Sequence, residues 1–142
     1  MRTQVLIVGL GPTGAVLAGL LGLLGIRTHV LERDHEIHAL PRAVHFDDEI
    51  MRVFQALGIA ERVAEVAIIN KGMQFRDAGG KLLLDWPRPQ TEGPQGWHPS
   101  WRFHQPNLDR ILRDRLSDFP SVTVSLGTEA ASLTDHGTHV SV

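Results

Sequence analysis

The fold of this 142-residue chain is decided by residues 5–14, which read VLIVGLGPTG. Four aliphatic residues predict a buried β-strand, and a glycine-rich turn follows them directly and leads into an apolar helix. Gly9 allows a sharp turn, Gly11 has no Cβ to obstruct a diphosphate, and Gly14 permits close packing of helix against strand. The positive end of the helix would point at such an anion. The stretch therefore predicts a dinucleotide-binding site.

A second strand is predicted over residues 28–32, and it ends in Glu32, eighteen residues beyond Gly14. A carboxylate at this position can accept hydrogen bonds from both hydroxyls of an adenosine ribose, and it would repel a 2′-phosphate. The predicted order of strand 3–9, helix 12–25 and strand 28–32 is typical of a βαβ unit in a parallel sheet.

Composition limits the other function classes. Residues 5–26 carry no charge and are long enough to span a bilayer, but Gly9, Gly11 and Pro12 interrupt the run, so we expect no membrane segment. The formal net charge of -2 gives no electrostatic basis for binding nucleic acid or an acidic membrane. Without cysteine there is no disulfide and no thiolate. A cytoplasmic protein without a metal site is the expectation.

Further helices are predicted downstream of a polar loop at residues 33–44. A helix begins at Asp47 or Asp48, buries Ile50, Val53, Phe54 and Leu57 at helical spacing, and ends at Gly58. The acidic residues at its start cap the helix and complement its dipole. Residues 59–66 form another short helix, and a longer one from Pro106 places Leu108, Ile111, Leu112 and Leu116 on one face.

The antiparallel elements come from alternation. Apolar residues alternate on both sides of the turn at residues 77–80, which predicts a hairpin. Residues 85–101 hold all three tryptophans and four of the eight prolines, which predicts an irregular loop. Its tryptophans either cover the edge of a core or line an aromatic substrate pocket. Strands are also expected at residues 122–126 and from Val140 onward.

Four motifs occur in order along the chain, namely VLIVGLGPTG at 5–14, LER at 31–33, PRAVHFDDE at 41–49 and FHQPNL at 103–108. Together they resemble the N-terminal part of FAD-dependent aromatic hydroxylases, closest to the 3-(3-hydroxyphenyl)propionate hydroxylases and related phenol-type monooxygenases. The resemblance covers essentially the whole chain. It implies an incomplete α/β domain of the Rossmann-like FAD/NAD(P)-binding fold, a parallel sheet with helices plus an antiparallel hairpin.

The resemblance also implies cofactor-binding residues. The glycines of the turn would hold the FAD pyrophosphate, Glu32 the adenosine ribose, and Arg33 would flank the adenosine. Arg42 would approach the diphosphate and ribityl region, and Gln105 would contact the flavin nucleotide. Alternatives remain for three of these: a surface ion pair for Arg33, a solvated loop position for Arg42 and helix capping for Gln105. The full set is Gly9, Gly11, Pro12, Thr13, Gly14, Glu32, Arg33, Arg42 and Gln105.

For the whole protein, the resemblance implies a monooxygenase that uses FAD, NAD(P)H and O2 to hydroxylate a small phenolic substrate. Residues 1–142 would be the N-terminal part of its FAD-binding domain, with 70–101 directed toward the substrate region and the catalytic residues downstream. His45 is a candidate base for the phenol, against a histidine that only packs or hydrogen-bonds. Another FAD- or NAD-dependent oxidoreductase, or a non-catalytic nucleotide-binding fragment, remains an alternative. We also expect the fragment to self-associate, and a homo-oligomer is compatible with the sequence.

Overall fold

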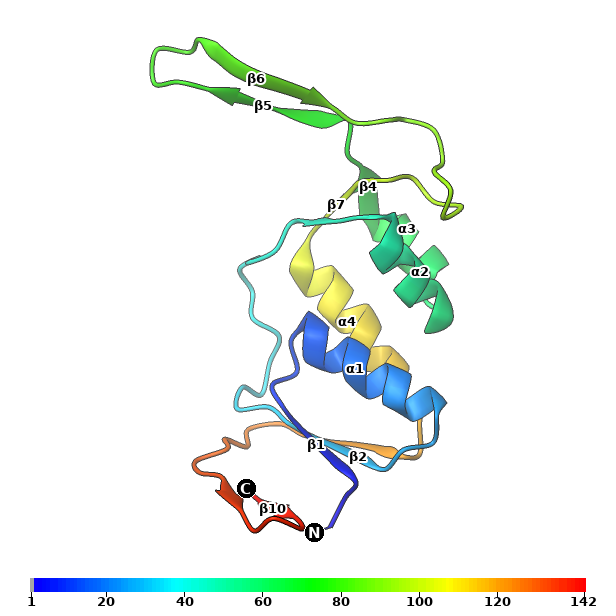
Figure 1. Ribbon diagram of the computed structural model, residues 1–142, viewed down its shortest axis with the longest axis vertical. Coiled ribbons are helices and arrows are strands. Elements are labelled where there is room, and N and C mark those ends of the chain that lie inside the picture. Colours follow the sequence, from blue (N-terminus) through cyan, green and yellow to red (C-terminus); the bar gives the residue numbers. More distant parts are fainter. Residues whose placement is uncertain (1) are drawn as a thin grey trace. The chain divides into compact units, whose positions relative to one another are not determined.

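The computed structural model describes residues 2–142, and Figure 1 traces their helices and strands. The chain divides into two compact units. Unit 1 comprises the residues up to Leu40 together with Asp109–Val142, and unit 2 comprises Pro41–Leu108.

Unit 1 contains the predicted βαβ arrangement. Strand β1 (Val5–Val8) is followed by helix α1 (Pro12–Leu23) and strand β2 (Thr28–Leu31). Strand β8 (Val122–Ser125) completes a parallel sheet of order β1-β2-β8. The predicted parallel sheet with its crossover helix is therefore confirmed, and Figure 1 shows β1 and β2 joined through α1.

The core of unit 1 forms where α1 faces the sheet. Val30 and Ala18 are fully buried, and Ile7 is 7% exposed. Gly22 allows the ring of Phe119 to approach α1, because a Cβ at this glycine would lie 2.9 Å from the Cβ of Phe119. The unit ends in a small hairpin of β9 (Thr134–Asp135) and β10 (Val140–Ser141), and β10 confirms the strand predicted from Val140 onward.

Unit 2 is built around a small antiparallel sheet with the order β3-β7-β4. Its strands are β3 (His45–Phe46), β4 (Ala67–Ile69) and β7 (Trp101–Phe103). Helices α2 (Asp48–Ala56) and α3 (Ala60–Val66) lie between β3 and β4 in the chain. The sequence predicts both helices but not this sheet, because strands of two or three residues are too short to show alternation.

Helix α2 begins as predicted, and its buried face differs from the predicted one at Ile50. The Asp47 carboxylate caps the helix by accepting the N–H of Ile50 at 3.0 Å. The side chain of Ile50 is 41% exposed, whereas Met51 is fully buried and Phe54 is 2% exposed. The prediction that Ile50 lies in the core is therefore wrong, because Met51 is buried in its place. Phe54 and Leu57 are buried as predicted.

Aromatic rings fill the core of unit 2. Phe46 stacks on Trp101 with ring centroids 6.2 Å apart, and it meets the edge of Phe54 at 5.4 Å. Trp101 is thus buried in the core, which agrees for this residue with the prediction that the tryptophans cover the edge of a core. Trp86 instead is 45% exposed. The guanidinium carbon of Arg88 lies over its ring, 3.9 Å from the ring centroid.

The predicted hairpin is confirmed as β5 (Gly72–Arg76) and β6 (Leu82–Pro87). Met73 pairs with Trp86 and Phe75 with Leu84. Strand β6 extends to Pro87, so the irregular segment predicted over residues 85–101 begins later than expected. Both strands are exposed along most of their length, and Figure 1 shows them as a two-stranded ribbon in green.

The chain passes from unit 2 to unit 1 within α4 (Gln105–Leu116). Its predicted apolar face is confirmed, because Leu108, Ile111, Leu112 and Leu116 are all at most 7% exposed. Within residues 2–142, the structure contains no helix with the length and hydropathy needed to cross a bilayer.

Candidate functional site

The glycine-rich turn adopts a backbone that its sequence requires. Gly9 has a φ of +101°, a conformation that residues with a Cβ rarely adopt. Its N–H donates to the carbonyl of Leu31 at 2.8 Å, so the turn starts while the chain is still paired with β2. The predicted role of Gly9 in a sharp turn is confirmed.

Gly11 and Gly14 differ in what surrounds them. A Cβ at Gly14 would overlap the carbonyl oxygen of Gly9 and would lie 3.2 Å from the carbonyl carbon of that residue. Gly14 is therefore needed for the close approach of α1 to the turn. A Cβ at Gly11 would meet no atom of the described residues, 2–142, within 4 Å. Packing within the chain does not require a glycine at position 11. The open space beside Gly11 lets a ligand approach the backbone.

The N-terminus of α1 carries no side-chain cap. Gly11 is the N-cap residue, Pro12 follows it at the first helical position, and the first turn contains no acidic residue. The N–H groups of Thr13 and Gly14 belong to the first turn, where a helix provides no carbonyl partner. An uncapped helix end with free N–H groups and a positive dipole is suited to an anionic ligand.

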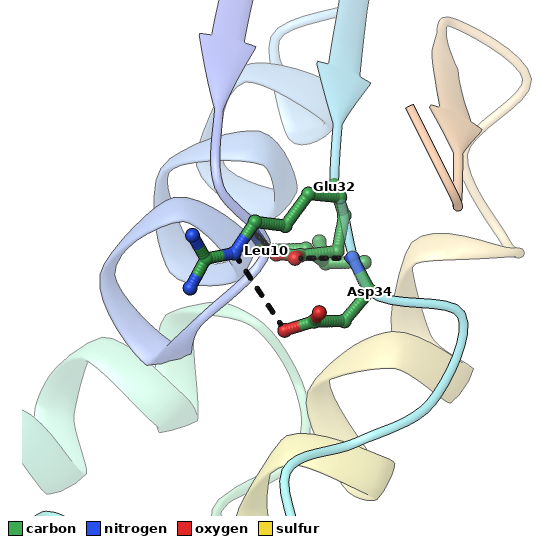
Figure 2. A network of polar contacts seen from close by, with 4 residues as sticks. Leu10, Glu32 and Asp34 are labelled. Atoms are coloured by element: carbon green, nitrogen blue, oxygen red, sulfur yellow. Dashed lines mark hydrogen bonds and ion pairs between the residues drawn. The ribbon is translucent and has the colours of Figure 1, made fainter. Parts of the chain in front are cut away.

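Glu32 binds the backbone on both sides of its carboxylate. Figure 2 shows this side chain between Leu10 and Asp34. The N–H of Leu10 donates to Oε2 at 2.6 Å, and the N–H of Asp34 donates to Oε1 at 3.0 Å. Leu10 lies between the first two glycines of the turn, so the carboxylate fixes the turn itself. This contact joins the two parts of the predicted nucleotide site within unit 1.

The same contacts keep Glu32 ionised. Partial burial alone raises the pKa of its carboxyl, but the hydrogen bonds from Asp34 and Leu10 and the charges of Arg113 and Arg33 outweigh it. The net effect lowers the pKa of Glu32 below its ordinary value of 4.5. A carboxylate has about four lone-pair positions, and the two backbone donors occupy two of them. The remaining two can accept the two hydroxyls of a ribose.

Arg33 forms the surface contact that was one of its two predicted alternatives. Its Nε lies 3.9 Å from Oδ2 of Asp34, and the two side chains are 70% and 60% exposed. An ion pair of this length and exposure contributes little to stability. The guanidinium is therefore not held in one place by this contact.

In unit 2, Gln105 holds the loop that carries Arg42. Gln105 is the first residue of α4 and is 4% exposed. Its Oε1 accepts the N–H of Arg42 at 2.9 Å and the N–H of Ala43 at 3.0 Å. The side chain of Arg42 is exposed. The Gln105 side chain thus orders the backbone at Arg42, a role that the sequence does not predict.

His45 is hydrogen-bonded to buried Ser100, which in turn is hydrogen-bonded to buried Asn70, and the sequence indicates neither residue. Nε2 of His45 lies 2.8 Å from Oγ of Ser100. The same oxygen accepts a hydrogen bond from Nδ2 of Asn70 at 3.0 Å. Ser100 is 1% exposed and Asn70 2% exposed. Ser100 and Asn70 belong to no motif, and only their burial as polar residues would have indicated them.

The predicted site residues thus fall into two groups. Unit 1 brings together the glycine turn and Glu32, with Pro12 and Thr13 in the first turn of α1 and Arg33 exposed beside them. Unit 2 brings together Arg42 and Gln105.

Comparison with known proteins identifies a family and relatives for this chain. A protein family described as FAD binding domain matches residues 2–142. The 3-(3-hydroxy-phenyl)propionate/3-hydroxycinnamic acid hydroxylase 2 of Burkholderia vietnamiensis is 41% identical over 99% of this chain and 26% of its own length. A probable NADH-specific resorcinol 4-hydroxylase of Rhodococcus jostii is 38% identical over 92% of this chain and 24% of its own length.

A solved structure shows the same fold. The flavin-dependent monooxygenase PieE, determined in complex with FAD and substrate, superposes with a TM-score of 0.82 at 24% identity. The match covers 99% of this chain and 26% of that protein. The chain spans about a quarter of the length of the curated relatives that it matches. Because the family match extends over residues 2–142, this chain belongs to the FAD-binding domain family.

Proposed function

We propose that this chain supplies the adenosine- and diphosphate-binding part of an FAD-dependent monooxygenase, which hydroxylates a phenolic compound with NAD(P)H and O2. The contrast between Gly11 and Gly14 supports this proposal most directly. One glycine is required by packing, and the other leaves space that no atom of residues 2–142 fills. Such space beside an uncapped helix N-terminus fits the diphosphate of a dinucleotide.

The residues of unit 1 fit FAD in the following way. The backbone of the turn at Gly9 and Gly11 would lie against the diphosphate, and the N–H groups of Thr13 and Gly14 would donate to its oxygens. Glu32 would accept the ribose hydroxyls through the lone pairs that its backbone contacts leave unused. When bound, FAD supplies the activation of O2 and the transfer of oxygen to the ring.

In unit 2, Arg42 would bind the cofactor through its guanidinium. A guanidinium donates two parallel hydrogen bonds to phosphate oxygens, which makes arginine well suited to a diphosphate. Gln105 would keep the backbone of the Arg42 loop in place through the two N–H groups that it accepts. Arg33 would contribute at most a mobile charge near the adenosine, since its one ion pair is long and exposed.

The substrate class rests on the relatives. Two of them are named for hydroxylating hydroxyphenyl or resorcinol compounds, which supports a small phenolic substrate for the whole protein. The name of one relative specifies NADH, which supports a nicotinamide as reductant. We further propose a cytoplasmic location, a homo-oligomer as the compatible assembly, and no part for nucleic acid or membrane.

Binding of FAD by the purified chain tests the proposal. We expect flavin fluorescence to change on titration with FAD, and Glu32→Ala to weaken binding by at least about tenfold, or 1.4 kcal/mol. Glu36→Ala is the matched control, because Glu36 lies on the exposed loop after β2. Equal losses in both variants would remove Glu32 from the site. Binding of NADH without any binding of FAD would favour a nicotinamide-dependent dehydrogenase instead.

A further inference from the structure

A directed chain of hydrogen bonds in unit 2 ends at His45. The N–H of Gly72 donates to Oδ1 of Asn70 at 3.2 Å, which fixes the orientation of the Asn70 amide. Its Nδ2 therefore faces Ser100 and donates to Oγ at 3.0 Å. Asn70 and Ser100 are buried, so these polar groups depend on each other for hydrogen bonds.

The direction of the last bond follows from the first two. Ser100 already accepts a hydrogen from Asn70, and its own hydroxyl hydrogen needs an acceptor in this buried position. Within residues 2–142, the side-chain acceptor available to the Ser100 hydroxyl is Nε2 of His45, which lies 2.8 Å from Oγ. Ser100 therefore donates to Nε2, and the neutral imidazole carries its proton on Nδ1, since the partner of one ring nitrogen sets the state of the other.

This tautomer determines what His45 can offer to a ligand. The residue is exposed, and no residue within 2–142 hydrogen-bonds to its Nδ1. A neutral imidazole that presents Nδ1–H is a hydrogen-bond donor and has no free lone pair for taking a proton. The arrangement argues against His45 as the base that deprotonates a phenol.

A positive charge lies next to this donor. His45 pairs with Arg102 across β3 and β7, and Ile68 pairs with Arg102 across β4 and β7. Residues that face each other across an antiparallel pair lie on the same side of the sheet, with Cβ atoms about 5 Å apart. All three side chains are exposed, and none of the residues at 45–46, 67–69 and 101–103 is acidic. This side of the sheet therefore offers a donor and a cation without a competing carboxylate from its own strands.

We propose that His45 and Arg102 bind an anionic oxygen, belonging to a carboxylate or a phosphate, with Asn70 and Ser100 as positioning residues that hold His45 as a donor. Ile68 supplies an apolar neighbour for the carbon skeleton of the ligand. The proposal does not depend on whether unit 1 binds a dinucleotide.

The tautomer can be measured directly in the full chain. Long-range ¹H–¹⁵N spectra at about pH 8.5, well above the ordinary histidine pKa, separate Nδ1–H from Nε2–H imidazoles. We expect Nδ1–H at His45 in the wild type and a growing Nε2–H population in Ser100→Ala. Ser117→Ala removes an exposed hydroxyl that contacts no histidine and should change nothing. An Nε2–H imidazole at His45 in the wild type would overturn the proposal.

Anion binding is tested on the same resonances. Sodium 3-phenylpropionate and inorganic pyrophosphate are the two probes, and 3-phenylpropan-1-ol is the uncharged control. We expect one or both anions, but not the alcohol, to shift the His45 resonances, and the responding anion identifies a carboxylate or a phosphate. Arg102→Gln should weaken that binding about tenfold, whereas Arg27→Gln, at an exposed arginine of unit 1, should not. No shift with either anion, or equal losses in both variants, would overturn the proposal.

Discussion

Gly11→Ala and Gly14→Ala add the same methyl group at two positions of one turn, and the structure predicts opposite consequences. At Gly14 the new Cβ would overlap the backbone oxygen of Gly9, so the turn or the helix must move. At Gly11 the new Cβ would meet no atom within 4 Å in the part of the chain that the structure describes. The φ of -73° and ψ of -178° at Gly11 are open to any residue. Gly11→Ala therefore tests ligand binding, and Gly14→Ala tests packing.

The expected magnitudes separate the two roles. Gly14→Ala should cost about 3 kcal/mol from forced displacement of backbone, of which the helix propensity of alanine offsets about 1 kcal/mol. The net loss of about 2 kcal/mol corresponds to a fall in Tm of roughly 4–8 °C for a chain of this size. Gly11→Ala replaces a tolerated N-cap residue by a poor one and should cost only about 0.5–1 kcal/mol. Its affinity for FAD should nevertheless fall by at least about tenfold, because the methyl group occupies the space left for the diphosphate.

Thermal unfolding and flavin titration of both variants provide the measurement. We expect Gly11→Ala to lose more free energy of FAD binding than of folding, and Gly14→Ala to lose folding stability even without ligand. If Gly11→Ala binds FAD as well as the wild type does, the open space at Gly11 is not where the diphosphate lies. If Gly14→Ala unfolds at the wild-type temperature, the close approach of α1 to the turn is not essential for the fold.

Three further outcomes follow from the contacts. Because the pKa of Glu32 is lowered from 4.5, its ionised form adds stability above that pH, and this is lost as the pH falls through the lowered pKa. The unfolding free energies of the wild type and Glu32→Gln in urea should therefore differ at neutral pH and converge as the pH falls below the lowered pKa, whereas a constant difference would contradict this. Gln105→Ala should lower the free energy of unfolding by about 1–3 kcal/mol and speed hydrogen exchange of the N–H groups of Arg42 and Ala43, which donate to Gln105. Unchanged exchange would show that water replaces the Gln105 side chain. Met51→Ala should cost about 2–5 kcal/mol by calorimetry and Ile50→Ala less than about 1 kcal/mol; equal costs would contradict the assignment of the buried face.

The parts of the fold that the sequence predicts are those with strong local signals. A four-residue aliphatic strand, a glycine turn and an apolar helix follow each other without interruption, so β1 and α1 could be predicted together. Asp47 and Gly58 mark the two ends of α2 by cap chemistry, which depends only on neighbouring backbone. The buried face of α2 could not be predicted as securely, because Ile50 and Met51 are both apolar and only tertiary packing selects between them.

The parts that the sequence does not predict depend on contacts between distant segments. Strands β3 and β7 pair across more than fifty residues and are only two and three residues long, so neither shows a period of its own. The chain of Asn70, Ser100 and His45 has the same origin. No spacing rule connects these residues, and their hydrogen bonds exist only once the sheet has formed. Local patterns therefore predict elements and the glycine turn, but not how unit 2 positions its polar side chains.

Glu32 illustrates how a correctly predicted residue can have a second role. The sequence predicts an acid that binds a ribose, but the structure also shows its carboxylate accepting the N–H of Leu10 within the glycine turn. Loss of this carboxylate should then disturb the diphosphate site as well as remove the ribose acceptor. Inorganic pyrophosphate, which has no ribose, separates the two effects when its binding is followed at the backbone resonances of Gly11 and Thr13. We expect Glu32→Ala to weaken pyrophosphate binding there, and unchanged binding would mean that Glu32 acts on the sugar alone.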